Sequence, residues 1–224
     1  MRGTIHDIHQ RPVEVRAARA TLHGDLALPD QAHGVVLFAH GSGSSRFSSR
    51  NRAVAQYLNA GGFATLLLDL LSADEETVDR ATGELRFDIP FLGERLILAA
   101  DWLAREPETA TLPLGLFGAS TGAAAALITA AERADSVRAV VSRGGRPDLA
   151  APALGRVRAP TLLIVGGADE TVLELNRTAS AALQCEKRLA VIPRATHLFP
   201  EPGTLEEVAR LALGWMREHV SCEL

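Results

Sequence analysis

One serine in the sequence lies in a pentapeptide that is typical of a nucleophile. Gly118-Ala119-Ser120-Thr121-Gly122 follows a short apolar run and precedes a stretch of small residues that indicates a helix. In a strand-to-helix turn of this kind the glycines let the backbone bend sharply, so that the serine hydroxyl is exposed at the end of the strand. The pattern therefore predicts Ser120 as the nucleophile of an acyl-transfer reaction. The alternative is a glycine-rich turn that contains a serine by chance.

Two partners for the serine follow it in the sequence. A serine hydroxyl is a poor nucleophile until a base takes its proton, and the base needs an acid that orients it. In an elbow of this type the acid and then the histidine follow the serine, each just after a later strand. Asp169 follows the apolar run 161–165 and His197 follows the run 189–192, so Ser120, Asp169 and His197 are predicted as a catalytic triad. Taken singly, Asp169 is also typical of a helix N-cap, and His197 of an ordinary loop histidine.

The segment 40–43, with the sequence His-Gly-Ser-Gly, supplies backbone donors after the apolar run 35–39. We predict that the N–H groups of Ser42 and Thr121 hold the oxyanion of the tetrahedral intermediate. The competing interpretation is a phosphate-binding loop, because glycine- and serine-rich turns before a helix also bind anions. No Gly-Lys-Ser or Gly-Lys-Thr follows the segment, which excludes a Walker-type P-loop.

Four arginines fall in two loops beside the predicted site. They are Arg46, Arg50, Arg143 and Arg146. An arginine fork binds carboxylates and phosphates, so these side chains are candidates for binding an anionic substrate. The alternative is that they pair with acidic side chains, either Asp148 or those of the segment 70–88.

The elements that must position these residues are short, almost continuously apolar runs, typical of parallel strands buried on both faces. They are 35–39, 64–68, 114–117, 137–141, 161–165 and 189–192. Helical patterns lie between them at about 50–60, 90–105, 121–134, 171–183 and 204–219. This alternation predicts an α/β fold with a doubly wound, mostly parallel sheet, whose strands end at one common edge. The runs 13–17 and 21–28 predict an antiparallel hairpin at the N-terminal edge.

One long stretch interrupts the alternation. The segment 70–88 carries six acidic residues against Arg80 and Arg86, and we predict a solvated acidic loop there. The segment 142–159 is too short to hold a cap domain, and no linker rich in Pro, Gly or Ser divides the chain. We therefore expect a single domain over 1–224, with its core at about 13–219.

Composition narrows the function further. Of 224 residues, 47% are hydrophobic and 22% charged, and 23 basic against 27 acidic side chains give a net charge of −4. No sustained basic stripe is present, so nucleic acid is not the expected partner. No apolar run is long enough to span a membrane. The residues 1–13 lack the apolar core of a signal peptide, and we expect a cytoplasmic protein.

Neither cysteines nor histidines indicate a structural or metal site. Cys185 and Cys222 are too few for a disulfide framework and do not have zinc-ligand spacing. His6 and His9 are three residues apart in a polar tail that lacks a pattern of acidic ligands. We expect no metal and no cofactor, and the sequence leaves a homo-oligomer open.

The chain resembles the α/β-hydrolases over about 13–219, and within them the lidless branch of dienelactone-hydrolase-like proteins. The matching motifs are the segments 40–43 and 118–122, Gly166-x-x-Asp169 and Ala195-Thr196-His197. The resemblance implies an α/β-hydrolase fold without a cap, and an enzyme that hydrolyses a small carboxylic ester, thioester or lactone through an acyl-enzyme.

One feature departs from this family pattern. Dienelactone hydrolases typically use a cysteine nucleophile, whereas this elbow carries Ser120, which favours a serine esterase. Two other classes of function remain as alternatives. One is a ligand-binding protein that kept the fold without turnover, and the other is a phosphate- or nucleotide-binding protein that uses the loop 40–46.

Overall fold

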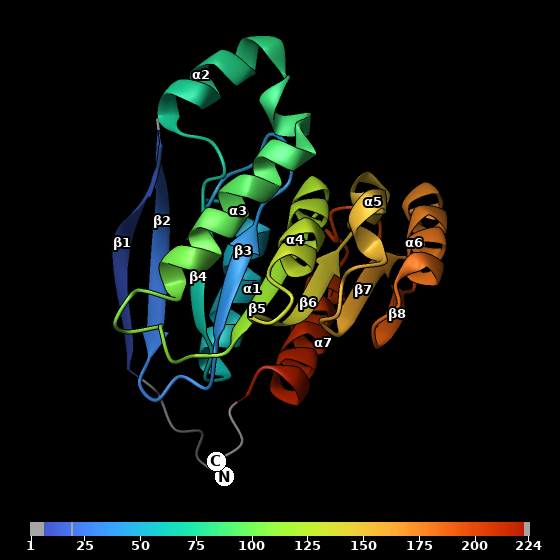
Figure 1. Ribbon diagram of the computed structural model, residues 1–224. Helices are drawn as coiled ribbons and strands as arrows, with labels where there is room; N and C mark the ends of the chain where they lie inside the picture. Colours follow the sequence, from blue (N-terminus) through green and yellow to red (C-terminus); the bar gives the residue numbers. More distant parts are fainter. Residues whose placement is uncertain (1–6, 19, 222–224) are drawn as a thin grey trace.

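The computed structural model describes residues 7–18 and 20–221. Within them eight strands form one sheet in the order β1-β2-β4-β3-β5-β6-β7-β8 (Figure 1). The strands are β1 (Ile8–Ala17), β2 (Ala20–Pro29), β3 (Val35–Ala39), β4 (Ala64–Leu68), β5 (Leu114–Ala119), β6 (Val137–Arg143), β7 (Thr161–Gly166) and β8 (Lys187–Ile192). The helices are α1 (Ser49–Ala60), α2 (Ala73–Thr82), α3 (Ile89–Leu103), α4 (Thr121–Glu132), α5 (Ala151–Leu154), α6 (Glu170–Ala182) and α7 (Thr204–His219). Two short 3-10 helices, η1 (Leu85–Phe87) and η2 (Pro147–Ala150), complete the list.

The N-terminal edge of the sheet is antiparallel, as predicted. β1 pairs with β2 from Ile8↔Pro29 to Ala17↔Ala20, and β2 pairs antiparallel with β4. All other pairs, from β4–β3 to β7–β8, are parallel. β1 begins five residues earlier than the predicted run 13–17, because its exposed half carries polar residues that do not show as an apolar run.

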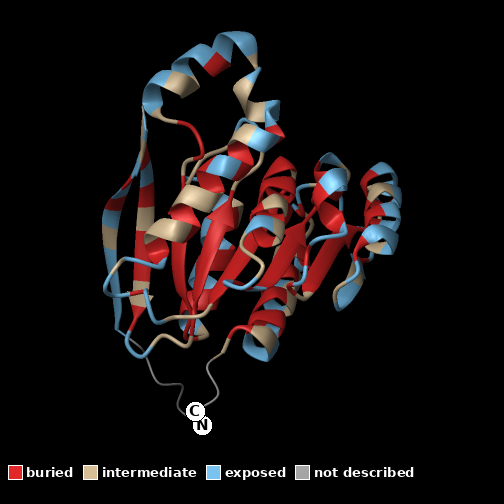
Figure 2. Ribbon diagram, viewed as in Figure 1, coloured by how far each residue is buried: buried red, intermediate tan, exposed pale blue. Residues whose placement is uncertain are grey.

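Helices cover both faces of the sheet, which is the doubly wound arrangement (Figure 1). α3, α4 and α6 lie on one face, and α1 and α7 lie on the other. All five residues of β3 are buried, and its side chains alternate between two cores: Leu37 joins the core under α3 and α4, and Phe38 the core under α1 and α7. Figure 2 shows the central strands buried along their length. These strands end at one edge, where the loops that follow them meet.

The predicted acidic loop 70–88 is wrong: it contains α2 and η1. Ser72 and Glu75 form a capping box at the start of α2, and Gly83, at φ 70°, ends the helix. The acidic residues of the first turn lie where the helix dipole stabilises negative charge. Asp79 is buried, and its carboxylate accepts hydrogen bonds from the backbone N–H groups of Leu85 and Arg86. The many charges favour a solvated loop, but the Ser-x-x-Glu pattern of Ser72 and Glu75 indicates the start of a helix.

The segment between β6 and β7 carries η2 and α5 and no cap domain, as expected. Figure 1 shows α2 rising beyond the edge at which the parallel strands end. By contrast, β1 begins and α7 ends at the opposite edge of the sheet (Figure 1). Among the helices of the described residues, none combines the length and the apolar character that a membrane span requires.

Candidate active site

Ser120 lies in a strained turn between β5 and α4. Its backbone has φ 51° and ψ −121°, a combination that non-glycine residues rarely adopt. The glycines on both sides are required by close packing. A Cβ at Gly118 would collide with the backbone of Ala123, and one at Gly122 with the carbonyl oxygens of Ala39 and His40. The elbow is therefore held against the end of β3.

The structure brings the three predicted triad residues together. The Nε2 atom of His197 lies 3.4 Å from Oγ of Ser120, and its Nδ1 atom lies 2.7 Å from Oδ2 of Asp169. The side chain of Asp169 is 15% exposed and that of His197 is 37% exposed. The three side chains follow β5, β7 and β8 at the common edge of the sheet. The contact between Ser120 and His197 is at the long end of the hydrogen-bond range.

Backbone hydrogen bonds join the two loops that carry Asp169 and His197. The N–H of Gly167 donates to the carbonyl of Ile192 at 2.8 Å, and that of Ala168 to the carbonyl of Ala195 at 3.0 Å. Asp169 lies at the N-cap position of α6, yet its side chain makes no capping hydrogen bond. Its carboxylate contacts His197 instead, so the helix-cap interpretation of Asp169 does not hold.

Glu201 fixes the loop around His197 and is not among the residues predicted from the sequence. Its carboxylate accepts hydrogen bonds from the backbone N–H of Thr196 and, at 2.7 Å, from the Thr196 hydroxyl. The hydrogen bond from the Thr196 hydroxyl is the largest of the effects that lower the pKa of Glu201. Phe199 lies between Thr196 and Glu201 in the chain; its side chain is buried and its backbone has φ 55°. The loop therefore turns sharply beside His197. No sequence motif marks this pairing, because the two residues share a loop rather than an element.

The predicted oxyanion donors lie beside each other, and one of them already has a partner. The N–H of Ser42 donates to the hydroxyl Oγ1 of Thr121 at 2.8 Å. This contact joins the segment 40–43 to the elbow. A Cβ at Gly41 would lie 3.0 Å from Cβ of Ser120, so Gly41 must be small for the segment to reach the nucleophile.

His40 connects the same segment to the end of β4. Its Nε2 atom accepts a hydrogen bond from the N–H of Leu70 at 3.1 Å, and its Nδ1 atom lies 2.9 Å from the carbonyl oxygen of Gly41. Because Nε2 is an acceptor, the ring proton is assigned to Nδ1, which donates to Gly41. Burial lowers the pKa of His40, so the ring is neutral at pH 7.

Two of the four candidate arginines are neutralised by acids. Arg46 contacts Asp69 through its guanidinium and lies 3.6 Å from Asp25. Arg146 makes two hydrogen bonds to the carboxylate of Asp148, at 2.9 and 2.7 Å, and this pairing raises the pKa of Arg146. The predicted alternative of pairing with Asp148 is therefore confirmed for Arg146. Arg46 is also paired, but with Asp69 and Asp25, which lie outside the predicted segment 70–88.

Arg50 and Arg143 have different surroundings. Neither makes an ion pair within the described residues. Arg143 is buried at the end of β6, and one of its guanidinium nitrogens lies 3.3 Å from Oδ1 of Asn51 on α1. Its Nε and Nη1 atoms, and the Nε atom of Arg50, are buried without a hydrogen-bond partner.

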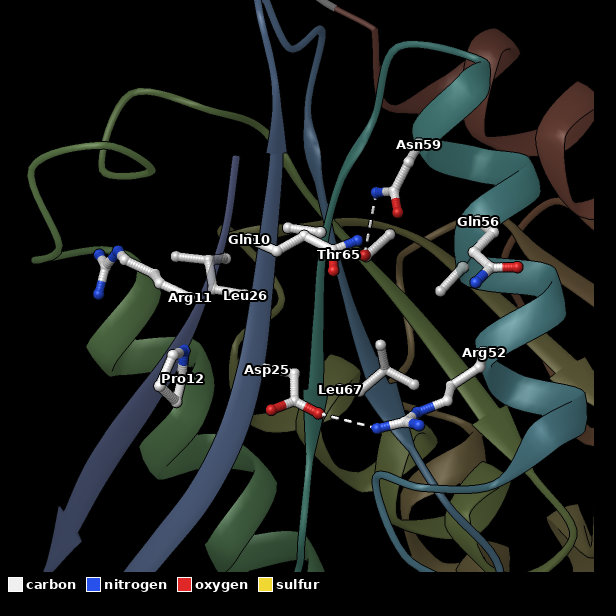
Figure 3. A pocket seen from close by; sticks show the side chains of 12 residues that line it. Gln10, Arg11, Pro12, Asp25, Leu26, Arg52, Gln56, Asn59, Thr65 and Leu67 are labelled. Carbon is white, nitrogen blue, oxygen red and sulfur yellow. Dashed lines mark hydrogen bonds and ion pairs between the residues drawn. The ribbon is translucent and has the colours of Figure 1, made fainter. Parts of the chain in front are cut away.

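A cavity of about 380 Å³ lies away from the triad, between the N-terminal hairpin and α1. Figure 3 shows two pairs among its polar side chains, Arg52 with Asp25 and Asn59 with Thr65. No serine, cysteine or histidine is among the described residues that line it. A hollow of about 610 Å³ lies nearer the site, between the segment 43–48 and α2.

Within the described residues one cluster has the composition of a metal site. It consists of Glu186, Glu218 and His219, whose ligand atoms lie within 4.8 Å of one another. The cluster joins the start of β8 to the end of α7, at the edge opposite Ser120. The predictions for His6 and Cys222 lie outside the described residues, and His9 is exposed on β1.

Comparisons with known proteins identify the family and the fold of the chain. A model of the dienelactone hydrolase family matches residues 22–218. The crystal structure of a dienelactone hydrolase from Anabaena variabilis is 55% identical, covers 96% of this chain and 100% of its own, and has a TM-score of 0.94. Est1E from Butyrivibrio proteoclasticus, whose structure is also known with ferulic acid bound, is 17% identical. The match covers 92% of this chain and 98% of Est1E, with a TM-score of 0.78. At this identity the likeness shows only that the two proteins share a fold.

One curated relative carries a name from another class of enzyme. A proposed phosphoribosyl transferase of Mycobacterium tuberculosis is 56% identical over 213 residues. The match covers 95% of this chain and 47% of that protein, so the chain spans about half the length of this relative.

Proposed function

Since the chain belongs to the dienelactone hydrolase family, we propose that it hydrolyses a small carboxylic ester, thioester or lactone with Ser120 as nucleophile. The observation that carries the proposal is the line of contacts from Asp169 through His197 to Ser120 at the ends of three strands. Fold alone does not decide function, but this arrangement of acid, base and nucleophile is the one that acyl transfer needs.

In the first half of the reaction Oγ of Ser120 attacks the substrate carbonyl carbon while Nε2 of His197 takes the hydroxyl proton. Asp169 stabilises the imidazolium that forms. The tetrahedral intermediate collapses when its bond to the leaving group breaks, and His197 returns the proton to that group. The acyl group is then bonded to Ser120.

In the second half a water molecule loses a proton to His197 and attacks the acyl-enzyme. The second intermediate collapses, the carboxylic acid leaves, and Ser120 recovers its proton. The N–H of Thr121 and that of Ser42 hold the oxyanion in both steps. Ser42 must then donate to the oxyanion rather than to the Thr121 hydroxyl, which is its partner in this structure.

The phosphate-loop alternative is less well supported by these contacts, because the Ser42 N–H faces the elbow and donates to Thr121. The Mycobacterium tuberculosis relative is named as a phosphoribosyl transferase, but this chain matches only 47% of that protein. The contacts among Ser120, Asp169 and His197 favour hydrolysis over both phosphate binding and phosphoribosyl transfer.

A fluorophosphonate probe tests the proposal directly. The probe should label the protein, and mass spectrometry should locate the adduct on Ser120. Ser120→Ala should remove the adduct and lower turnover of a p-nitrophenyl ester by about five to six orders of magnitude. The control Ser136→Ala changes an exposed serine before β6 and should keep both the label and the rate. A protein that takes no label, or a Ser120→Ala variant that keeps its turnover, would overturn the proposal and favour a non-catalytic binding protein.

A further inference from the structure

The loop that follows β6, residues 143–146, holds the backbone of Ser120 on both sides. The N–H of Ser120 donates to the carbonyl oxygen of Arg143 at 3.2 Å, and the carbonyl oxygen of Ser120 accepts a hydrogen bond from the N–H of Arg146 at 3.0 Å. Ser120 has the strained backbone of the elbow, at φ 51°. Strain of this kind persists only where the surrounding structure holds it. The loop 143–146 is therefore part of what keeps the nucleophile in place.

The same loop packs against the base. Gly144 has φ 49°, and a Cβ there would lie 3.0 Å from the carbonyl oxygen of His197 and 3.6 Å from the ring atom Cε1 of His197. The N–H of Gly144 donates to the carbonyl oxygen of Ile164 in β7 at 2.8 Å. Since the loop contacts both Ser120 and His197, a shift of the loop would change the 3.4 Å distance between Oγ and Nε2.

The side chain of Asn176, on α6, holds this loop. It is fully buried, and its Nδ2 atom donates to the carbonyl oxygen of Gly145 at 2.9 Å and to that of Val172 at 2.8 Å. The reverse orientation of the amide would place Oδ1 against two carbonyl oxygens, so the orientation with two donated hydrogen bonds is the one that fits. α6 begins directly after Asp169. One side chain thus joins the helix that follows the acid to the loop that holds the nucleophile.

An asparagine at this position is unfavourable for the fold alone. Asparagine is a weaker helix former than leucine or alanine, which also suit a buried position better. The Oδ1 atom of Asn176 is buried and has no hydrogen-bond partner within the described residues. A buried polar atom without a partner lowers stability. Residues that break local rules in this way are expected at functional sites.

We propose that Asn176 is a positioning residue for the reaction at Ser120. By fixing the loop 143–146 through Gly145, it sets the distance and direction from Oγ of Ser120 to Nε2 of His197. The inference rests on the proposed function and adds a residue to its machinery. Loss of this contact should lower kcat and leave KM nearly unchanged, because it disturbs the geometry of proton transfer rather than the binding of the substrate.

Two variants of Asn176 test the role of its donors. Asn176→Leu has a similar size and donates no hydrogen bond. With p-nitrophenyl acetate we expect a kcat about ten- to a hundredfold lower and a KM within about twofold of the wild type, since a displacement of about 1 Å can cost about a hundredfold in rate. Asn176→Asp has nearly the wild-type shape and replaces the NH2 group by an oxygen, so it should also lower kcat. It tests the donor without a change in packing.

Asn59→Leu is the matched control. Asn59 is another buried asparagine, 2% exposed, and it donates to the carbonyl oxygen of Phe63 at 2.9 Å and to the hydroxyl of Thr65 at 3.0 Å. It lies on α1, and its hydrogen bonds do not reach the loop 143–146. Thermal unfolding should show a comparable loss of stability, while kcat should stay within about twofold of the wild type. A folded Asn176→Leu or Asn176→Asp protein with wild-type kcat, or an equal loss of kcat in Asn59→Leu, would overturn the inference.

Hydrogen exchange separates this inference from the proposed function. In NMR the amide protons of Ser120 and Arg146 should exchange at least about tenfold faster in Asn176→Leu than in the wild type, and at the wild-type rate in Asn59→Leu, because the loosening is local. If the wild type cleaves the ester through Ser120 but kcat does not depend on Asn176, the positioning role fails and the hydrolase stands. If no ester is cleaved and no probe labels Ser120, the hydrolase fails, and the exchange rates still decide whether Asn176 holds the elbow.

Discussion

The carboxylate of Asp169 lies 2.7 Å from the ring nitrogen Nδ1 of His197 and makes no hydrogen bond to the helix that begins beside it. An aspartate at the N-cap position usually accepts a hydrogen bond from the first turn of its own helix. Here the side chain turns away from α6 towards the imidazole. The helix start keeps its favourable field for a negative charge, while the carboxylate is free to orient the base.

Removing the base and removing the orienting acid should lower kcat by different factors. His197→Ala should lower kcat of a p-nitrophenyl ester about as much as Ser120→Ala, because the two residues act as a unit. Asp169→Asn should cost about four orders of magnitude, since it mainly favours the wrong tautomer of the histidine. Steady-state kinetics with circular dichroism as a folding control measure both. If Asp169→Asn keeps its activity, another carboxylate must orient His197. The first candidate is Asp148, which lies in the loop after β6 and pairs with Arg146.

His40 should make the protein less stable in mild acid. Burial lowers its pKa from an ordinary value of 6.5, so the unfolded chain binds a proton at a pH where the folded protein does not. The free energy of unfolding should therefore be highest above pH 6.5 and fall below it, by at most about 1.4 kcal/mol per pH unit from this group. Urea unfolding between pH 7 and 5 measures the effect. His40→Asn should flatten the dependence in this range; a slope equal to that of the wild type would contradict the assignment.

Replacing each of two glycines by alanine should change the free energy of unfolding in opposite directions. Gly122→Ala places a Cβ against backbone carbonyls of β3 and its following loop, where nothing flexible can move aside. We expect a loss of about 1–3 kcal/mol. Gly214→Ala, on the exposed face of α7 with nothing within 4 Å of the new Cβ, should gain about 0.5–1 kcal/mol. Thermal unfolding measures both, at roughly 2–4 °C per kcal/mol for a chain of this size. Equal melting temperatures for the two variants would refute the packing argument.

Arg143→Met should stabilise the protein, because Arg143 is a buried charge at the end of β6 without an acidic partner within the described residues. The apolar side chain keeps much of the arginine stem volume and removes a buried charge that has no acidic partner. Loss of the hydrogen bond to Asn51 offsets part of the gain. We expect a net increase of about 1 kcal/mol, or roughly 2–4 °C in melting temperature. A marked decrease would mean that the guanidinium supports the fold through contacts that its unpartnered atoms do not indicate.

The parts of the fold that periodicity determines were predictable from the sequence. The runs 35–39 and 64–68 have the same bounds as β3 and β4, because strands buried on both faces consist of apolar residues from end to end. α2 was missed because its acidic residues were interpreted by their charge alone. The Ser-x-x-Glu pattern at its start identifies a helix independently of charge.

The triad was predictable for a different reason. Chain order and the ends of strands are visible in a sequence, and they suffice to bring Ser120, Asp169 and His197 to one edge. Arginine pairing was predictable only where the partner is near in the sequence, as Asp148 is to Arg146. The other partners are remote: Asp69 lies 23 residues from Arg46, and Asn51 lies 92 residues from Arg143. Which guanidinium groups stay without an acid depends on how side chains meet across elements, and no local pattern encodes that.

The positions of the first described strand and the last helix have a practical consequence. β1 begins and α7 ends at the edge of the sheet opposite the one where the parallel strands end (Figure 1), and Ser120 and His197 follow the ends of β5 and β8. A polypeptide, dye or surface tether attached beyond either point would leave the molecule away from the loops that admit substrate. Immobilisation through either end should therefore preserve turnover, and a second module joined at these points would meet the hydrolase without blocking it.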